Sequence, residues 1–210
     1  LMKIDSLGIL IFDKTIIQPS TGYCNNPVGS PGNSFSGITD THDDGLAILT
    51  RWTDCNDAST PSVPTLMRFN NLGDTLFTKW FPYSGSYSGG TNIIFDLDNT
   101  LVENIDHGYS FIYNRIESGG TSSPAHHFRL MRVDSLGNQI WDNGYNVSGI
   151  SGYASVRGMI KISTGGYLVY GETFLTKIND QGLIQWTQTI PNPIQNQLRS
   201  IIQTNNGFLA

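Results

Sequence analysis

One twelve-residue motif occurs four times in this chain and constrains its fold more than any other feature. The copies are LMKIDSLGILIF from Leu1, LMRFNNLGDTLF from Leu66, LMRVDSLGNQIW from Leu130 and LTKINDQGLIQW from Leu175. Relative to its glycine, each copy has Leu seven residues before, Lys or Arg five before, Asp or Asn three before, and Phe or Trp four after. A pattern that recurs in this way indicates a stack of similar supersecondary units.

Each copy of the motif is predicted to form a β-hairpin. In the third copy Leu130 and Arg132 fall on one face and Met131 on the other, which is the period of two that a strand requires. The Asp or Asn opens a tight turn, the Gly closes it in a left-handed conformation, and the aromatic residue on the return strand fills space between sheets. These structural positions are Asp5, Gly8 and Phe12; Asn70, Gly73 and Phe77; Asp134, Gly137 and Trp141; and Asn179, Gly182 and Trp186.

A second, looser motif with its own glycine precedes the first. It reads THDDGLAILT around Gly45, IDHGYSFIYN around Gly108, STGGYLVYGE around Gly166 and TNNGFLA around Gly207. A further strand-like segment lies ahead of it, so each unit has four antiparallel strands, A to D, which predicts an all-β fold of β-propeller blades. The expected segments of this single region, 1–210, are strands C and D of a first blade at 1–17, blades at 34–81, 92–146 and 154–190, and strands A and B of a last blade at 197–210.

The spacing of the repeats indicates insertions. The glycines of the first motif are 65, 64 and 45 residues apart (8 to 73, 73 to 137 and 137 to 182). A four-stranded blade takes about 40 to 50 residues, so the earlier units carry extra segments. The prediction is three complete blades with a half blade at each end. Either the halves pair into a fourth blade, or the sequence belongs to a larger propeller, which the lack of Met at position 1 and the end in mid-strand favour.

Composition agrees with an all-β module. Charged residues make up 14% of the chain, against about 25% in average proteins. The net charge is −5 and no stretch is rich in Lys and Arg, so we expect no nucleic-acid partner. No apolar run approaches the ~20 residues of a membrane-spanning helix, so we expect no membrane insertion. We also expect no cofactor.

The two cysteines fall in segments that a propeller would bring to one side. In a blade, the A–B and C–D turns lie on one side of the disc, and the B–C loops and D–A crossovers on the other. Cys24 falls in a D–A crossover and Cys55 in the next B–C loop, so a disulfide is reasonable in an oxidising compartment. Two free thiols remain the alternative, because sequence does not give the Cα distance.

The insertions share that same side. They run from about 18 to 33, 52 to 65, 82 to 91 and 114 to 127, whereas the opposite side has only short turns. Function tends to reside on loops that a rigid frame holds, so the side with insertions is the expected contact surface. Its candidate ligand-binding residues are Tyr23, Trp52, Tyr83 and Tyr87, and the alternative is that these aromatic residues pack only against their own loops.

One stretch resembles an enzyme motif. Asn92 to Asn104 reads NIIFDLDNTLVEN, which is similar to the first motif of the haloacid-dehalogenase phosphatases. By that resemblance Asp96 would be the nucleophile and Asp98 the general acid and base, and the pair would hold a magnesium ion. The motif lacks its required context, because antiparallel Gly-rich strands follow it, and the alternative is a strand with a turn at Asn99.

The sequence predicts no metal site. Asp40, His42 and Asp44 alternate before Gly45 like the opening of a calcium loop, but Arg51 occupies the twelfth position, where a bidentate Glu is needed. A polar turn is the expected structure. No Cys or His lies at zinc-ligand spacing around the four histidines, so we expect them to be plain surface or turn residues.

Two resemblances suggest a functional setting. The pattern of Asp or Asn, Gly and then Trp resembles the blades of quinoprotein-like propellers, although the turn is one residue shorter and no quinone pocket is implied. LMRVDSLGNQIW, followed by a segment like STGGYLVYGE, resembles propeller regions of large secreted proteins that the type IX route exports in the Bacteroidota. That resemblance implies an extracellular or cell-surface location.

We therefore expect a non-catalytic binding or display scaffold, as in adhesion, that contacts an extracellular protein or a glycan through the loops of one face. The alternative is a propeller-based glycan lyase or hydrolase with a site near the central axis. Such an enzyme needs converging carboxylates from innermost strands, for which Asp40 and Glu103 are the visible candidates.

Overall fold

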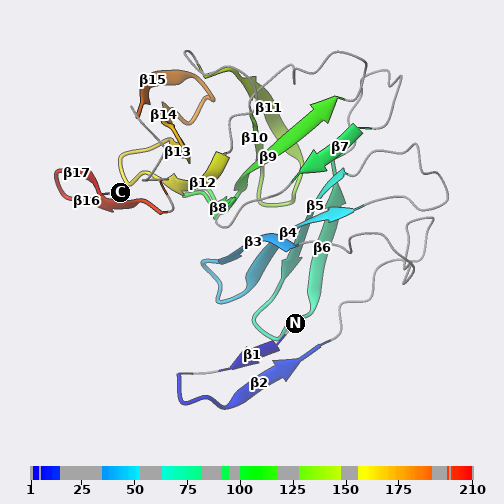
Figure 1. The fold of residues 1–210 in the computed structure, drawn as a ribbon. Helices are drawn as coiled ribbons and strands as arrows, with labels where there is room; N and C mark the ends of the chain where they lie inside the picture. Colours follow the sequence, from blue (N-terminus) through cyan, green and yellow to red (C-terminus); the bar gives the residue numbers. More distant parts are fainter. Residues whose placement is uncertain are drawn as a thin grey trace.

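The structure is a computed structural model, and it describes residues 2–4, 6–14, 35–52, 63–81, 91–94, 100–117, 128–147, 156–190, 198 and 200–209. These residues form strands and turns and contain no helix (Figure 1). Accordingly, the described part of the chain offers no helix of the length and hydrophobicity that crossing a membrane requires. The fold is all-β, as predicted.

Two four-stranded antiparallel sheets follow chain order from their first strand to their last. Blade 1 has the order β3-β4-β5-β6, with β3 (Phe35–Asp40), β4 (Leu46–Trp52), β5 (Val63–Phe69) and β6 (Thr75–Trp80). Blade 3 has the order β12-β13-β14-β15, with β12 (Val156–Lys161), β13 (Tyr167–Gly171), β14 (Phe174–Ile178) and β15 (Ile184–Thr189). In both sheets the four strands are A, B, C and D of the predicted repeat.

The first strand of blade 2 is split into two pieces. The sheet contains β7 (Thr91–Ile94), β8 (Leu101–Glu103), β9 (Tyr109–Glu117), β10 (Phe128–Val133) and β11 (Gln139–Tyr145). β7 and β8 pair along the same edge of β9, with Ile94 opposite Asn114 and Leu101 opposite Phe111. Strand A of blade 2, for which the sequence allows a turn at Asn99, is thus two strands, and residues 95–99 between them lie outside the described part.

Two short hairpins flank the three blades. They are β1 (Met2–Ile4) with β2 (Leu10–Asp13) and β16 (Ile202–Thr204) with β17 (Gly207–Leu209), drawn blue and red in Figure 1. Each hairpin is its own two-stranded sheet, so the described residues form no composite fourth blade and no closed ring. Strand A of blade 2, β8, contacts both β3 of blade 1 and β12 of blade 3 although they are distant in sequence, which is the arrangement of successive blades around an axis.

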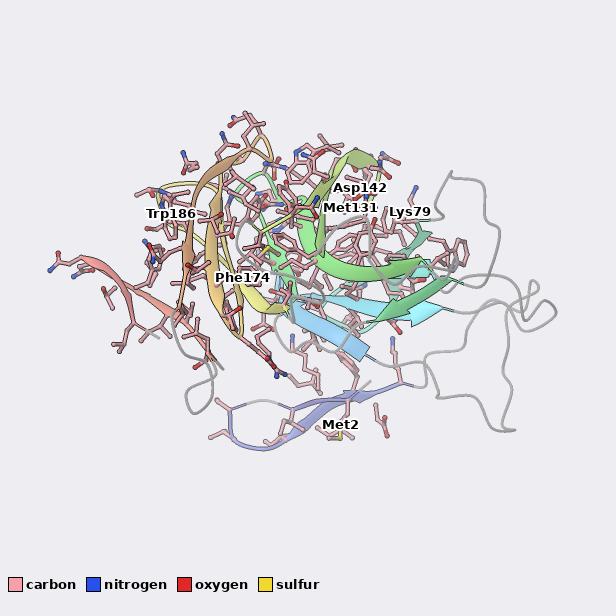
Figure 2. All side chains as sticks on the ribbon, turned by 45° about the horizontal axis from the view of Figure 1, so that its top comes forward. Met2, Lys79, Met131, Asp142, Phe174 and Trp186 are labelled. Atoms are coloured by element: carbon pink, nitrogen blue, oxygen red, sulfur yellow. The ribbon has the colours of Figure 1, made fainter. Side chains whose placement is uncertain are left out.

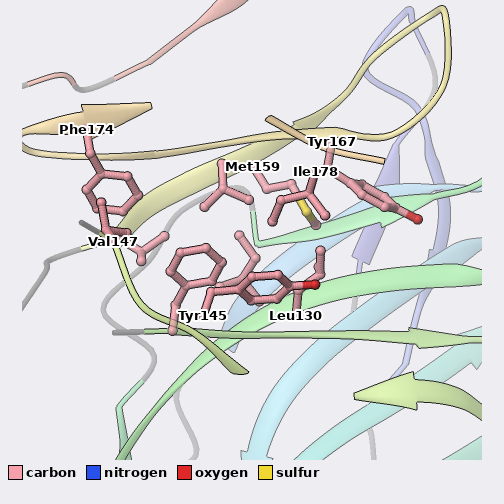
Figure 3. Packing of buried hydrophobic residues seen from close by; sticks show 11 residues of the cluster. Leu130, Tyr145, Val147, Met159, Tyr167, Phe174 and Ile178 are labelled. Carbon is pink, nitrogen blue, oxygen red and sulfur yellow. The ribbon is translucent and has the colours of Figure 1, made fainter. Parts of the chain in front are cut away.

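The core lies between the faces of successive blades. Leu130 and Ile112 face blade 3, whereas their neighbours Met131 and Phe111 face blade 1. Figure 3 shows the contact between blades 2 and 3, where Tyr145 and Leu130 lie opposite Met159 and Ile178. A strand packed on both faces needs a continuous apolar run, which explains segments such as YSFIY at 109–113.

The outer D strands are much more exposed than the B strands. Every residue of β13 is buried, whereas most of β15 is exposed. Figure 2 shows a similar contrast between strands C and D of blade 3, with Phe174 of β14 inside the blade and Trp186 of β15 on its periphery. The apolar pattern therefore weakens outward along each blade, because the outermost strand has solvent on one edge.

Several strands extend beyond their expected limits. Trp52, which we expected at the start of a loop, is the last residue of β4 and pairs with Val63 of β5. Residues 114–117 also continue β9 rather than beginning an insertion. Backbone pairing with a neighbouring strand continues at these places despite their polar sequence.

Candidate functional site

The blades have two chemically different ends. At the turn end lie the short A–B turns (residues 41–45, 104–108 and 162–166) and the C–D turns (70–74, 134–138 and 179–183). At the opposite, loop end lie the strand ends that flank residues 53–62, 82–90 and 118–127. The predicted short-turn side and side with long connections describe blades 1 and 2, whereas in blade 3 only residues 172 and 173 connect β13 to β14.

Most of the predicted ligand-binding residues cannot be placed. Tyr23, Tyr83 and Tyr87 lie outside the described residues, as do Cys24 and Cys55. Trp52 is the last residue of β4, at the loop end, and residues 53–62 follow it directly. The contact surface and the disulfide therefore stay predictions.

The Asp or Asn of the first motif caps its turn by accepting backbone hydrogen bonds. Asn70 Oδ1 accepts from the amides of Leu72 (3.0 Å) and Asp74 (2.8 Å). The same pair of contacts occurs at Asp134 and at Asn179, with distances between 2.8 and 3.1 Å. Asp5 lies outside the described residues. The motif carboxylate or amide is thus occupied in holding the turn.

The motif glycine also makes room for an aromatic ring from the preceding blade. Gly73, Gly137 and Gly182 have φ of +76°, +77° and +80°, and a Cβ built on each would lie 2.8, 2.9 and 3.4 Å from the rings of Phe12, Phe77 and Trp141, respectively. The two repeated positions therefore form one contact between successive blades. At Gly8 no described atom lies within 4 Å of such a Cβ, and Trp186 at the other end of the series is 39% exposed.

The glycine of the second motif is required by close packing within its blade. A Cβ on Gly45, Gly108 or Gly166 would overlap a strand-C carbonyl oxygen, that of Phe69, Val133 or Ile178. At the first two turns the left-handed residue is not this glycine but the one before it, since Asp44 and His107 both have φ of +61°. Asp and His tolerate that region better than most residues.

The basic residue of the first motif ties strand C to the A–B turn. Arg68 is almost fully buried and bonds Asp43 and the Phe69 carbonyl. Arg132 donates from Nη2 to Asp106 Oδ2 (2.7 Å) and from Nη1 to the Asp180 carbonyl of the next blade (3.1 Å). A hydrogen bond from Thr41, together with Arg68, lowers the pKa of Asp43 to about 2 despite the opposing effect of desolvation. These charges are therefore engaged in structural contacts.

A buried polar cluster joins blades 2 and 3 beneath the turn end. Tyr167 Oη lies 2.7 Å from Ser110 Oγ and donates to Asn104 Oδ1 (2.9 Å), while Asn104 Nδ2 donates to Ser110 Oγ (2.9 Å). Burial raises the pKa of Tyr167, so the phenol stays protonated at neutral pH. Every member of the cluster has a partner, as buried polar groups require.

Another ion pair lies toward the loop end of blade 2. Arg129 Nε donates to Asp142 Oδ1 (3.0 Å), and Tyr113 Oη donates to Asp142 Oδ2 (2.8 Å). Burial, followed by the Asp142 charge, raises the pKa of Tyr113 well above its usual value. The pair braces the three main strands of this blade close to residues 118–127.

Two histidines and a glutamate meet at the turn end between blades 1 and 2. His42 lies in the A–B turn of blade 1, Glu103 ends β8, and His107 lies in the A–B turn of blade 2. Glu103 Oε1 is 2.8 Å from His42 Nδ1 and 3.9 Å from His107 Nδ1. The imidazole rings stack with their centroids 3.5 Å apart. We call these three residues the His–Glu cluster.

The sequence did not predict the His–Glu cluster. His42 was considered with its neighbours Asp40 and Asp44, whereas the structure brings it to residues 61 and 65 positions away in the next repeat. Glu103 was considered as a possible carboxylate of an axial enzyme site, and it contacts two imidazoles. The one sequence signal was that both A–B turns carry a histidine near their glycine.

The phosphatase-like aspartates, Asp96 and Asp98, lie outside the described residues. The strands on either side, β7 and β8, pair antiparallel with β9. A haloacid-dehalogenase site requires a parallel sheet flanked by helices, and the described part of the chain has neither. The surroundings of the motif therefore differ from those of the family it resembles.

No protein-family model matches the sequence, and no curated protein matches it. Among solved structures, the chain is similar to a protein of unknown function from Bacteroides caccae, with 15% sequence identity and a TM-score of 0.49. The match covers 85% of this chain and 52% of that one, so the chain spans about half the length of the matched structure.

Proposed function

We propose that this chain is part of a non-catalytic binding or display scaffold in a secreted or cell-surface protein. One observation supports this proposal: the residues that recur in each repeat make structural contacts. The turn-capping residues, glycines, aromatic residues and arginines hold the turns and blades together. The segments that differ in length between repeats all border the loop end. Variable segments on a rigid frame are where recognition usually resides.

The proposed ligand is an extracellular protein or a glycan. Tyr23, Trp52, Tyr83 and Tyr87 are the candidate contacts, because aromatic faces suit both sugar rings and protein hot spots. The type IX route of the Bacteroidota is the proposed means of export. A gene that encodes this region together with a separate C-terminal sorting domain would support that route, and a gene with a different export signal would contradict it.

A glycan array probed with the purified chain tests the binding proposal. A variant with Ala at the four aromatic positions should lose the signal. The matched control replaces three exposed leucines of the turn end, Leu72, Leu136 and Leu183, with Ala. Loss of binding in the control but not in the aromatic variant would contradict the proposed surface. Release of product from a bound glycan would favour the enzyme alternative.

A further inference from the structure

The His–Glu cluster has the composition of a metal site. Its three candidate ligand atoms all lie within 4.8 Å of one another. Neutral imidazole nitrogens and carboxylate oxygens are ligands that Zn²⁺ and related ions prefer. We propose that His42, Glu103 and His107 bind a divalent transition-metal ion of the zinc type. This inference is separate from the proposed scaffold function, because the cluster lies at the end opposite the proposed contact surface.

The spacing of the cluster fits such an ion. Donor atoms on a tetrahedral Zn²⁺ with bonds of about 2.0–2.1 Å lie about 3.3 Å apart. The two imidazole Nδ1 atoms are 2.8 and 3.9 Å from Glu103 Oε1, so the observed distances bracket that value. The third pair of donors, one nitrogen from each imidazole, lies within 4.8 Å. Because a bound ion lies in the plane of each ring, binding also requires the two stacked imidazoles to turn apart.

The carboxylate is oriented before any ion binds. Glu103 has only 14% of its side chain exposed, and its Oε2 accepts a hydrogen bond from the backbone amide of His42 (2.9 Å). That bond directs the second oxygen, Oε1, toward the two rings. Hydrogen-bonded support of this kind orients metal ligands and strengthens binding.

The two histidines are held by tight turns in adjacent blades. His107 has φ of +61°, and its amide donates to the carbonyl of Asn104 (2.9 Å). The Asn104 side chain in turn accepts a hydrogen bond from Tyr167 in the buried polar cluster. The imidazoles are 47% and 50% exposed, so water can complete the coordination. An ion here would cross-link blade 1 to blade 2, and binding to the folded state alone would raise thermal stability.

Isothermal titration of the metal-free chain with ZnCl₂ tests the proposal. We expect one equivalent of Zn²⁺ to bind in preference to Ca²⁺ or Mg²⁺, because imidazole nitrogens suit zinc-type ions whereas Ca²⁺ and Mg²⁺ prefer oxygen ligands. His42→Ala, Glu103→Gln and His107→Asn should each weaken binding by at least ~100-fold, since even supporting residues contribute 10–100-fold. Asn is chosen at position 107 because it tolerates a positive φ.

The remaining histidines provide the matched control. A His126→Ala/His127→Ala double variant should bind Zn²⁺ like the unchanged protein. The thermal midpoint of each variant is measured without metal first. If a variant does not fold, the site can be located by NMR of the unchanged protein. Zn²⁺ should shift the imidazole ring resonances of His42 and His107 and not those of His126 and His127. No binding at 100-fold excess over protein, or binding lost only in the control, would overturn the proposal.

Discussion

Replacing Gly137 with Ala should reveal how strongly the repeated glycine and aromatic residue couple adjacent blades. Gly137 has φ of +77°, and a Cβ there would lie 2.9 Å from the Phe77 ring and 2.7 Å from Lys79 Cγ. The left-handed conformation costs a non-glycine residue about 1–2 kcal/mol. Overpacking adds about 1–3 kcal/mol, and a less flexible unfolded chain returns about 0.4–1 kcal/mol. The expected loss of stability is about 2–4 kcal/mol.

The assay is urea unfolding of a double-mutant cycle. In a Phe77→Ala background the ring is gone but the backbone strain and the contact with Lys79 remain, so Gly137→Ala should then cost less, about 1–2 kcal/mol. In a thermal scan, the single change should lower the midpoint by about 4–16 °C for a chain of this size. Equal costs in the two backgrounds would refute the reasoning, because they would show that the Phe77 ring does not contribute to the requirement for glycine.

Three further predictions concern buried and paired polar groups. Tyr167→Phe should cost about 1–3 kcal/mol in urea unfolding, because it removes a buried donor to Asn104; an unchanged midpoint would contradict this. The pKa of Asp43 is lowered to about 2, so the ionised carboxylate stabilises the folded state above pH ~4 and this stabilisation is lost as the pH falls toward 2. Asp43→Asn should therefore flatten the plot of unfolding free energy against pH in that window. An unchanged slope of that plot would contradict the prediction. Arg132→Met should raise the pKa of Asp106 in an NMR titration, because burial already raises that pKa and the hydrogen bond from Arg132 is the main cause that lowers it; an unmoved value would contradict this contact.

The elements that the sequence predicted well depend on local chemistry. The turn at Asp134 is closed by hydrogen bonds to residues two and four positions later, so its signature lies within five residues of sequence. The alternation of Leu130 and Met131 likewise predicted a strand, and each of these residues packs against a different neighbouring blade. Interactions that span few residues leave a pattern that a single sequence displays.

The contacts between repeats could not be predicted in the same way. The packing of Phe77 on Gly137 spans 60 residues and depends on the distance and rotation between two sheets. The His–Glu cluster depends on the same geometry, since His42 and Glu103 belong to different blades. The break between β7 and β8 differs from these contacts in having a local signal, because the sequence allows a turn at Asn99, between the two strands.

The charged residues of blade 3 show that the blades preserve a contact rather than a residue. In blades 1 and 2 an arginine of strand C reaches an aspartate of the A–B turn, as Arg132 reaches Asp106. In blade 3 the corresponding turn position is Thr164. There Lys161 of strand A bonds Asp180 of the C–D turn instead, and its Nζ lies 4.4 Å from the centroid of the Tyr167 ring. The two hairpins of each blade are thus joined at the turn end by an ion pair whose sign is reversed in blade 3. On their other side the hairpins are linked by residues 53–62 in blade 1 and 118–127 in blade 2, but by residues 172 and 173 alone in blade 3. In all three blades the ion pair ties the hairpins at the end opposite this link and so restrains their relative twist.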